Sequence, residues 1–382
     1  DTVWVHDYHL IPLGERLRAG IAPSALLASL GRGGEGRCSL LRKGAGRRHH
    51  CDVAATRRAA MAAGVALAAS GGQQRGPLRG RRVVRVIDID ERPAVGAPVQ
   101  RRVRPVFAEH AGIVEAPNKG LHMCRGEFIA RMDADDRMHR YRLQRQVEYF
   151  ESNPFLSVVS CLVETFAEDG VGEGMRIYQD WLNALVTHAD IAREIFIESP
   201  IANPTAMMRR SELVALGGYQ ERGWPEDYDL WLRYYLAGKL FAKVPEVLFY
   251  WREHAQRATH TQSRYSVESF LRAKAHFLID GPLQGRDGLL VWGAGKTGRR
   301  LVKHLQRCGA VLDAFIDITP KKIGGTLRGA PVIGPEAVVE WWRRFSRPVL
   351  IAAVASRGAR ALIRAQLEEW GLEEGVDYWC AA

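Results

Sequence analysis

The sequence predicts an α/β protein with two domains, and three observations lead to this prediction. From residue 102 onward, short apolar runs of strand type alternate with segments that carry apolar residues at helical spacing. Near residue 288 an apolar run is followed by glycines and then by an amphipathic helix pattern, which is typical of a parallel sheet. The chain has 382 residues, 47% of them apolar, which is enough for two buried cores.

The net charge of +11 is concentrated in one segment of the chain. Residues 31–104 carry 17 Lys and Arg against 5 Asp and Glu, so the rest of the chain is close to neutral. A nucleic-acid-binding protein usually carries its basic residues on one face of a folded domain, and this distribution does not predict such a face. We therefore expect no nucleic-acid partner.

The cysteines indicate a reducing compartment. None of the six forms a CxxC pair, so neither a disulfide framework nor a zinc site is expected. No apolar run approaches 18 residues, so no transmembrane helix is expected either. These features predict a cytoplasmic protein.

Residues 1–20 have the sequence DTVWVHDYHLIPLGERLRAG, which predicts a strand followed by the start of an amphipathic helix. This stretch resembles a motif of trehalose-6-phosphate synthases, in which the region matching His6, Asp7, Tyr8 and His9 lies at the sugar-donor site. The resemblance ends after about twenty residues, so that activity is not expected of the whole chain.

Residues 21–101 are rich in Arg, Ala and Gly and show weak apolar periodicity. A helix over 54–69 and a strand over 83–89 are the two elements that the pattern indicates. We expect the segment to be poorly ordered. The alternative is a flexible basic arm that attracts phosphates or anionic lipid.

Three carboxylates crowd into four positions in the acidic loop, Asp133–Asp136. The loop follows the apolar run Phe128-Ile129-Ala130, which predicts a buried strand. Like charges this close repel one another unless a cation lies between them, and oxygen ligands suit Mg²⁺ or Mn²⁺. The alternative is a turn whose aspartates cap the next helix.

The following segments continue the alternation of elements. A helix is predicted over 139–152 with Leu143, Val147 and Phe150 on one face, and Asn153-Pro154 ends it. One further helix is predicted over 173–197. A second acidic cluster, Glu226-Asp227, follows Pro225 at a predicted helix start, and a strand ending near Arg252 and His254 closes the domain.

The order of these motifs resembles a known family. The pieces that carry the resemblance are GIVEAPNKGL, RGEFIARMDADD, NPTAMMRR, GGYQERGWPEDYDLWLR and VPEVLFYWREH. Over about residues 102–256 the chain resembles family 2 glycosyltransferases, which are inverting enzymes with a GT-A fold. The resemblance implies a GT-A type glycosyltransferase domain over 102–261, which uses a nucleotide-sugar donor.

The resemblance also implies roles for individual residues. It makes Asp227 the general base, with Glu226 beside it as a residue that orients the acceptor or the helix. Burial among aromatic residues is expected to raise the pKa of Asp227, as a useful base requires. A Mg²⁺ or Mn²⁺ ion would bridge the donor diphosphate. The residues expected to hold the ion are Asp133, Asp135 and His254, and those expected at the donor are Asn118, Lys119, Asp136 and Arg252.

The chain departs from the family pattern before residue 102. The family grips the nucleotide with a strand, a helix and an acidic strand end, and the residues that should supply them form the Arg/Ala/Gly-rich segment. We interpret this segment as the product of a shifted reading frame or a faulty join. This hypothesis predicts weakened donor binding, and it fails if the other two frames of the gene encode no nucleotide-binding motif.

A linking helix is predicted over 262–285, followed by a Rossmann-like parallel-sheet domain over 286–382. A nucleotide or NAD(P) site is expected at Gly293, Gly295 and Gly298, with Asp317 as the ribose-binding acid. The pattern also resembles the N-terminal domain of bacterial sugar O-acyltransferases. The alternative is a sheet whose glycines serve packing alone.

Together these features predict a hexosyltransferase of surface polysaccharide synthesis. Its expected acceptor is a glycan or a lipid-linked glycan, and an association with the inner face of the cell membrane is expected with it. Two other functions stay open: a degenerate, non-catalytic sugar-nucleotide-binding protein, and an NAD(P)-dependent oxidoreductase acting through residues 286–382.

Overall fold

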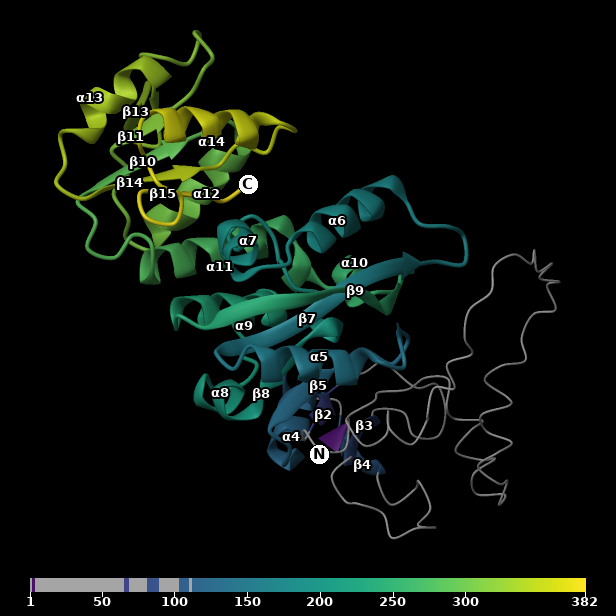
Figure 1. Ribbon diagram of the computed structural model, residues 1–382. Coiled ribbons are helices and arrows are strands. Elements are labelled where there is room, and N and C mark those ends of the chain that lie inside the picture. Colours follow the sequence, from purple (N-terminus) through teal and green to yellow (C-terminus); the bar gives the residue numbers. More distant parts are fainter. Residues whose placement is uncertain (1, 4–64, 69–80, 89–102, 110–111) are drawn as a thin grey trace, which may run out of the picture.

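The computed structural model describes residues 2–3, 65–68, 81–88, 103–109 and 112–382 (Figure 1). The described chain forms two α/β units joined by a helix, which agrees with the predicted fold class. The predictions for residues 1–20 and 21–101 lie outside the described residues, apart from the backbone of β1 (Thr2–Val3), β2 (Val65–Ala68) and β3 (Arg81–Asp88).

The larger unit is built on a mixed six-stranded sheet of order β2-β5-β8-β7-β9-β6. β1 and β3 form a separate three-stranded antiparallel sheet with β4. The remaining strands of these two sheets are β4 (Val103–Glu109), β5 (Phe128–Arg131), β6 (Arg137–Met138), β7 (Leu156–Phe166), β8 (Met207–Arg209) and β9 (Leu240–Arg252).

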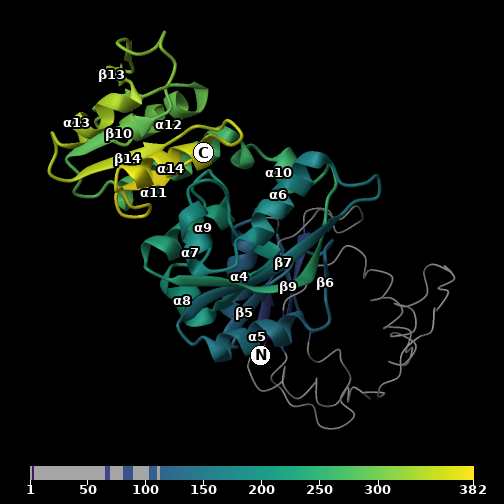
Figure 2. The same cartoon turned by 45° about the horizontal axis from the view of Figure 1, so that its top comes forward.

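Helices cover this sheet and connect its strands (Figures 1 and 2). They are α4 (Glu115–Met123), α5 (Arg142–Ser152), α6 (Glu173–Ala184), α7 (His188–Glu194), α8 (Arg210–Ala215) and α9 (Glu226–Leu236), with the 3-10 turn η2 (Asn203–Thr205).

The helix α5 shows why the apolar pattern was informative. Val147 and Phe150 are buried as predicted, and Phe150 stacks on Phe128 of β5 with ring centroids 4.5 Å apart. Leu143 is half-buried, and the helix ends at Ser152 before Asn153. The face that α5 buries therefore fixes the strand that leads into the acidic loop.

Two element predictions are wrong. Residues 173–197 form the two helices α6 and α7, because Thr187 starts a new helix: its hydroxyl accepts from the Asp190 backbone N–H at 3.2 Å, and the Asp190 carboxylate accepts from Thr187 N–H at 2.9 Å. Residues 65–68, within the predicted helix 54–69, form β2, which pairs in parallel with β5. A short apolar run fits a buried strand as well as a helix, so periodicity alone does not separate them.

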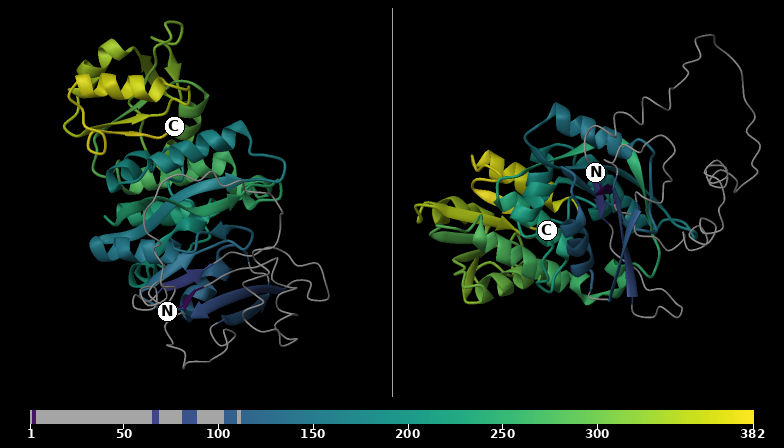
Figure 3. Two further views of the ribbon diagram at one scale, coloured as in Figure 1. Left: turned by 45° about the vertical axis from the view of Figure 1, so that its right-hand side comes forward. Right: turned by 90° about the horizontal axis from the view of Figure 1, so that it is seen from below.

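A linking segment joins the two units. It comprises α10 (Ala258–Thr261), the 3-10 turn η3 (Ser263–Tyr265) and α11 (Val267–Asp280). The Ser266 hydroxyl caps α11 by accepting from Ser269 N–H at 3.3 Å. In Figure 3 the two units lie at opposite ends of the described chain, with α11 beside the C-terminal unit.

The C-terminal unit has a six-stranded sheet of order β12-β13-β11-β10-β14-β15. From β13 to β15 all neighbours pair in parallel, and this is the strand order of doubly wound sheets. Its elements are β10 (Gly288–Trp292), α12 (Lys296–Arg307), β11 (Ala314–Ile316), β12 (Thr326–Leu327), β13 (Ala330–Ile333), η4 (Pro335–Ala337), α13 (Val338–Trp342), β14 (Pro348–Ala352), α14 (Ala359–Glu369) and β15 (Tyr378–Cys380).

Buried polar contacts connect the two units. The Glu194 carboxylate at the end of α7 accepts from Arg360 at 3.0 Å and from Arg364 at 2.7 Å, both on α14. It also accepts from the Trp181 indole N–H at 2.9 Å. The buried Lys274 ammonium of α11 donates to the carbonyls of Ile197 at 2.7 Å and Ala381 at 3.0 Å. The junction between the units is therefore specific rather than a loose linker.

The substitution Glu194→Gln is expected to destabilise the protein by about 1–3 kcal/mol, because it leaves the guanidinium of Arg360 without its buried counter-charge. Urea unfolding measures this loss. The matched control is Glu340→Gln, which removes a surface pair with Arg344 whose side chains are 73% and 48% exposed, and which should cost no more than about 0.5 kcal/mol. Equal effects of the two substitutions would show that Glu194 does not stabilise the junction.

Candidate active site

The acidic loop begins where the buried strand β5 ends. The Arg131 guanidinium is almost fully buried and donates to the Asp133 carboxylate. Burial lowers the pKa of Arg131, but the negative charge of Asp133 and its hydrogen bond outweigh that effect and raise it above its ordinary value. Arg131 therefore stays charged and fixes the first aspartate of the loop.

The other two aspartates of the loop contact the end of β9. The Asp135 carboxylate lies 2.9 Å from Nε2 of His254, and one Asp136 oxygen accepts from the Arg252 backbone N–H at 2.8 Å. β6 brings these segments together by pairing with β9, with Arg137 opposite Tyr250. The structure thus places Asp135 and Asp136 of the acidic loop against His254 and Arg252 at the end of β9.

Asp136 is only 8% exposed, and its second carboxylate oxygen is buried without a hydrogen-bond partner among the described residues. Burial raises the pKa of Asp136 well above its ordinary range, and the charges of Asp133 and Asp135 raise it further. The loop therefore concentrates negative charge that a cation would offset.

In the part of the chain that the structure describes, no three His, Cys, Asp or Glu side chains lie close enough together to hold a metal ion by themselves. His254 Nε2 lies 2.9 Å from an Asp135 carboxylate oxygen, and each side chain is more than a third exposed. Mg²⁺ is usually held by one or two carboxylates together with substrate phosphates. The donor set fits an ion whose coordination the substrate completes.

The structure shows one supporting residue that the sequence analysis missed. Arg142 of α5 is fully buried, and it donates to the carbonyl of Arg131 at 3.0 Å and to the side chain of Gln146 at 3.0 Å. Gln146 in turn donates to the carbonyls of Val159 at 2.7 Å and Thr205 at 2.9 Å. The sequence could have indicated this contact, because Arg142 and Gln146 lie four residues apart on the same helix face as Phe150.

The second acidic cluster lies at the start of α9, directly after Pro225. Glu226 is 2% exposed, and the Tyr265 hydroxyl lies 3.0 and 2.9 Å from its two oxygens. Burial raises the pKa of Glu226 to about 8, and the charge of Asp227 contributes to this shift. Near neutral pH Glu226 therefore carries a proton for most of the time.

Asp227 differs from its neighbour. It is half-buried, and its carboxylate accepts from the Tyr228 backbone N–H at 2.8 Å. Burial raises the pKa of Asp227 to about 6, while the Tyr228 hydrogen bond and the charge of Arg131 hold it down. At neutral pH Asp227 is therefore mainly ionised.

The two acidic clusters both lie within electrostatic range of Arg131. The Arg131 charge acts on Asp133 and also on Glu226 and Asp227. Burial raises the pKa of Tyr219, and the charges of Asp227, Glu226 and Asp133, which come from both clusters, raise it further. A substrate held beside the acidic loop would therefore lie near the pair at the start of α9.

Asn118 and Lys119 lie on α4. The Asn118 amide accepts from Tyr219 N–H at 2.9 Å and donates to the Tyr219 carbonyl at 2.7 Å, so it fixes the loop before α9. Gly218 in that loop has φ +65°, and a Cβ there would lie 2.5 Å from the Asn118 oxygen. Lys119 forms an exposed pair with Glu115 at 2.6 Å. Donor contacts by Asn118, Lys119, Asp136 and Arg252 stay predictions.

The glycine loop of the C-terminal unit lies between β10 and α12. Gly293 has φ +126°, and a Cβ on Gly298 would lie 1.8 Å from the Gly293 carbonyl, so both positions require glycine. Gly295 faces open space. The Asp317 carboxylate accepts from Ala294 N–H at 3.1 Å and from Lys322 at 2.8 Å. Asp317, the predicted ribose-binding acid, therefore already accepts hydrogen bonds from the protein itself. Nucleotide binding at this loop stays a prediction.

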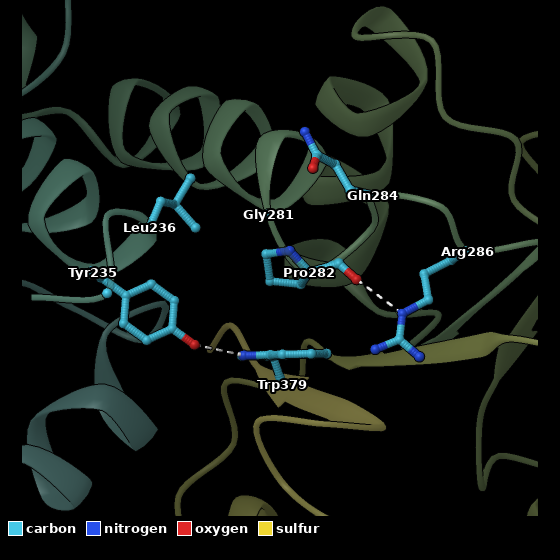
Figure 4. Close-up of a pocket in the computed structure, with 8 residues that line it drawn as sticks. Tyr235, Leu236, Gly281, Pro282, Gln284, Arg286 and Trp379 are labelled. Carbon is cyan, nitrogen blue, oxygen red and sulfur yellow. Dashed lines mark hydrogen bonds between the residues drawn. The ribbon is translucent and has the colours of Figure 1, made fainter.

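A hollow of about 320 Å³ opens at the junction of the two units (Figure 4). In this hollow the Trp379 indole donates to the Tyr235 hydroxyl at 3.1 Å, and Arg286 donates to the Pro282 carbonyl at 3.2 Å. None of the predicted site residues lines this hollow. It is therefore separate from the candidate active site.

The chain resembles known glycosyltransferases in sequence. Residues 94–216 match the family model described as glycosyl transferase family 2. The match includes the acidic loop and ends before Glu226. No helix in the described part of the chain is long and apolar enough to cross a membrane.

Individual relatives agree with the family match. The chain is 30% identical over 140 residues to the amylovoran biosynthesis glycosyltransferase AmsE of Erwinia amylovora, covering 37% of this chain and 50% of that protein. It is 24% identical over 169 residues to a UDP-Gal:alpha-D-GlcNAc-diphosphoundecaprenol beta-1,3-galactosyltransferase of Escherichia coli, covering 44% of this chain and 59% of that protein. The chain thus spans little more than half the length of these relatives.

Among solved structures, TarS of S. aureus in complex with UDP-GlcNAc is 17% identical, with a TM-score of 0.33, over 51% of this chain and 52% of that chain. The family model and these relatives show that residues 94–216 are similar to glycosyl transferase family 2.

Proposed function

We propose that this protein is a metal-dependent, inverting glycosyltransferase of the GT-A type that transfers a hexose from a nucleotide-sugar donor to a glycan or lipid-linked acceptor. The observation that carries the proposal is the pairing of two acidic clusters around Arg131. One cluster is the acidic loop with His254, and the other is Glu226 and Asp227. The first suits a diphosphate-bound cation, and the second suits proton transfer.

In this proposal Asp135 and His254, with Asp133 nearby, would hold Mg²⁺ or Mn²⁺. A bound ion would supply charge neutralisation for the departing diphosphate. Asp136 fixes the loop to the end of β9 by accepting a hydrogen bond from the Arg252 backbone N–H. Arg131 and Arg142 keep the loop at the end of β5 in place.

The reaction is a single displacement at the anomeric carbon of the donor. The acceptor hydroxyl oxygen forms a bond to this carbon as the bond from the carbon to the diphosphate oxygen breaks. The electron pair of the broken bond leaves on the nucleoside diphosphate, and the hydroxyl proton passes to Asp227. Asp227 suits this role because it is ionised at neutral pH and more exposed than Glu226.

The acceptor class is part of the proposal. The names of two relatives refer to amylovoran biosynthesis and to alpha-D-GlcNAc-diphosphoundecaprenol. By analogy we propose surface polysaccharide synthesis at the cytoplasmic face of the cell membrane. The identity of the donor sugar is the first property to determine by experiment.

A turnover assay tests the proposal. The protein is incubated with each common nucleotide sugar and a lipid-linked glycan acceptor, and release of the nucleoside diphosphate is measured with Mn²⁺ or with EDTA. We expect acceptor-dependent release from one donor, only with the divalent ion. Release that is equally fast in EDTA, or no release from any donor, would contradict the proposed function.

A further inference from the structure

The linking segment reaches into the candidate active site. Its 3-10 turn η3 (Ser263–Tyr265) places the Tyr265 hydroxyl within 3.0 Å of both oxygens of the buried Glu226. The neighbouring Arg264 has its Nη1 atom buried, without a hydrogen-bond partner among the described residues, and 3.9 Å from a Glu226 oxygen. These contacts come from a segment that lies between the two units and beyond the family match.

We propose that Tyr265 is a positioning residue for the pair Glu226-Asp227, so that the linking segment completes the active site. Glu226 is the first residue of α9 and Asp227 the second. A hydroxyl that contacts both oxygens of Glu226 fixes the first turn of the helix and, with it, the direction in which Asp227 presents its carboxylate. This inference rests on the proposed function, in which Asp227 accepts the proton.

The anchoring of Tyr265 supports this role. Ser266, the next residue, caps α11, and its hydroxyl lies 3.0 Å from that of Ser269. Arg264 is held by Glu221 at 2.7 Å, in the loop before α9. The turn is therefore fixed on one side to the linking helix and on the other to the loop that leads to the pair.

The charge state of Glu226 gives the proposal a measurable signature. The Tyr265 hydroxyl stabilises the ionised form of Glu226 and so lowers its pKa, against the stronger effect of burial, which leaves the pKa at about 8. Loss of the hydroxyl therefore moves the Glu226 titration to higher pH. The titratable and charged groups that act on Glu226 are Asp227 on α9, Arg131 on β5, Tyr219 before α9, and Arg264 and Tyr265 on η3.

Tyr265→Phe tests the proposal in two independent ways. The first is an infrared titration of the protonated carboxyl band without substrate, with Glu226→Gln used to assign the band. We expect the Glu226 midpoint to move to higher pH in Tyr265→Phe. An unchanged midpoint would overturn the proposal whether or not the protein is an active transferase.

The second measurement is the pH profile of turnover. We expect kcat to fall by about 10- to 100-fold in Tyr265→Phe with the KM for the donor little changed, because a displaced base loses reaction geometry rather than donor contacts. The decrease in kcat as the pH falls through about 6, which reports Asp227, should remain in the variant. Any change in kcat near pH 8, which reports Glu226, should move to higher pH. A drop in kcat with an unmoved profile would indicate a merely structural role and overturn the proposal.

The matched control is Tyr235→Phe, which removes a hydroxyl bonded to Trp379 at the junction of the two units. It should leave both the carboxyl titration and the pH profile unchanged. If wild-type protein turns over no donor while the midpoint still moves in Tyr265→Phe, the proposed function fails and the contact between Tyr265 and Glu226 remains. Equal changes in the two tyrosine variants would overturn the positioning role.

Discussion

Asp227→Asn is expected to lower kcat by about 10²- to 10⁴-fold, the usual contribution of a general base. The amide has the size of the carboxylate but cannot accept the proton of the acceptor hydroxyl. The hydrogen bond from Tyr228 N–H can still be accepted by the amide oxygen, so the start of α9 should keep its shape. Steady-state turnover with saturating donor and acceptor measures the effect.

The same residue predicts a pH dependence. Burial raises the pKa of Asp227 to about 6, so the base is ionised above that pH and protonated below it. Wild-type kcat/KM should therefore fall as the pH drops through about 6, and this acid limb should be absent from the residual activity of Asp227→Asn. Asp169→Asn, in the exposed turn after β7, is the control and should match wild type. An acid limb that persists in Asp227→Asn would assign the base to another group.

Asp135→Ala is expected to weaken the response to the divalent ion and to lower kcat/KM by about 10²- to 10³-fold, the usual loss when a preorganised electrostatic group is removed. The substitution deletes the carboxylate that faces His254 at 2.9 Å. Because the Asp135 side chain is 36% exposed and its contact to His254 is at the surface, the fold should tolerate the change.

Activity measured across a Mn²⁺ titration distinguishes this variant from others. Asp135→Ala should need far more Mn²⁺ for half-maximal activity, or should show no response at all. Asp169→Ala should respond as wild type does. An unchanged Mn²⁺ requirement in Asp135→Ala would remove Asp135 from the metal site and leave the capping interpretation of the acidic loop.

The parts of the site that were predictable depend on motif order and on local patterns. The acidic loop follows an apolar strand, and Glu226-Asp227 follows Pro225 at a helix start, so both could be located from neighbouring residues. Their meeting depends on long-range pairing, as between β6 and β9, which no local pattern specifies. The family resemblance supplied that information.

Other parts were not predictable, for identifiable reasons. Tyr265 lies 39 residues from Glu226 in the sequence, and nothing in its local sequence indicates this contact. The short strands β12 and β13 could not be located from the sequence, because Gly and Pro in this stretch are not typical of strands. The reading-frame hypothesis concerns residues 21–101, which lie outside the described residues except for β2 and β3.

The most direct test of the central claim is a thermal-shift comparison of three proteins: wild type, Asp135→Ala and Asp227→Ala. Each is measured with a panel of nucleotide sugars, with and without Mn²⁺, since a ligand that binds the folded state raises its melting temperature. We predict a metal-dependent shift in wild type and in Asp227→Ala, and its loss in Asp135→Ala alone. Equal behaviour of all three proteins would contradict the assignment of metal binding to Asp135 in the acidic loop.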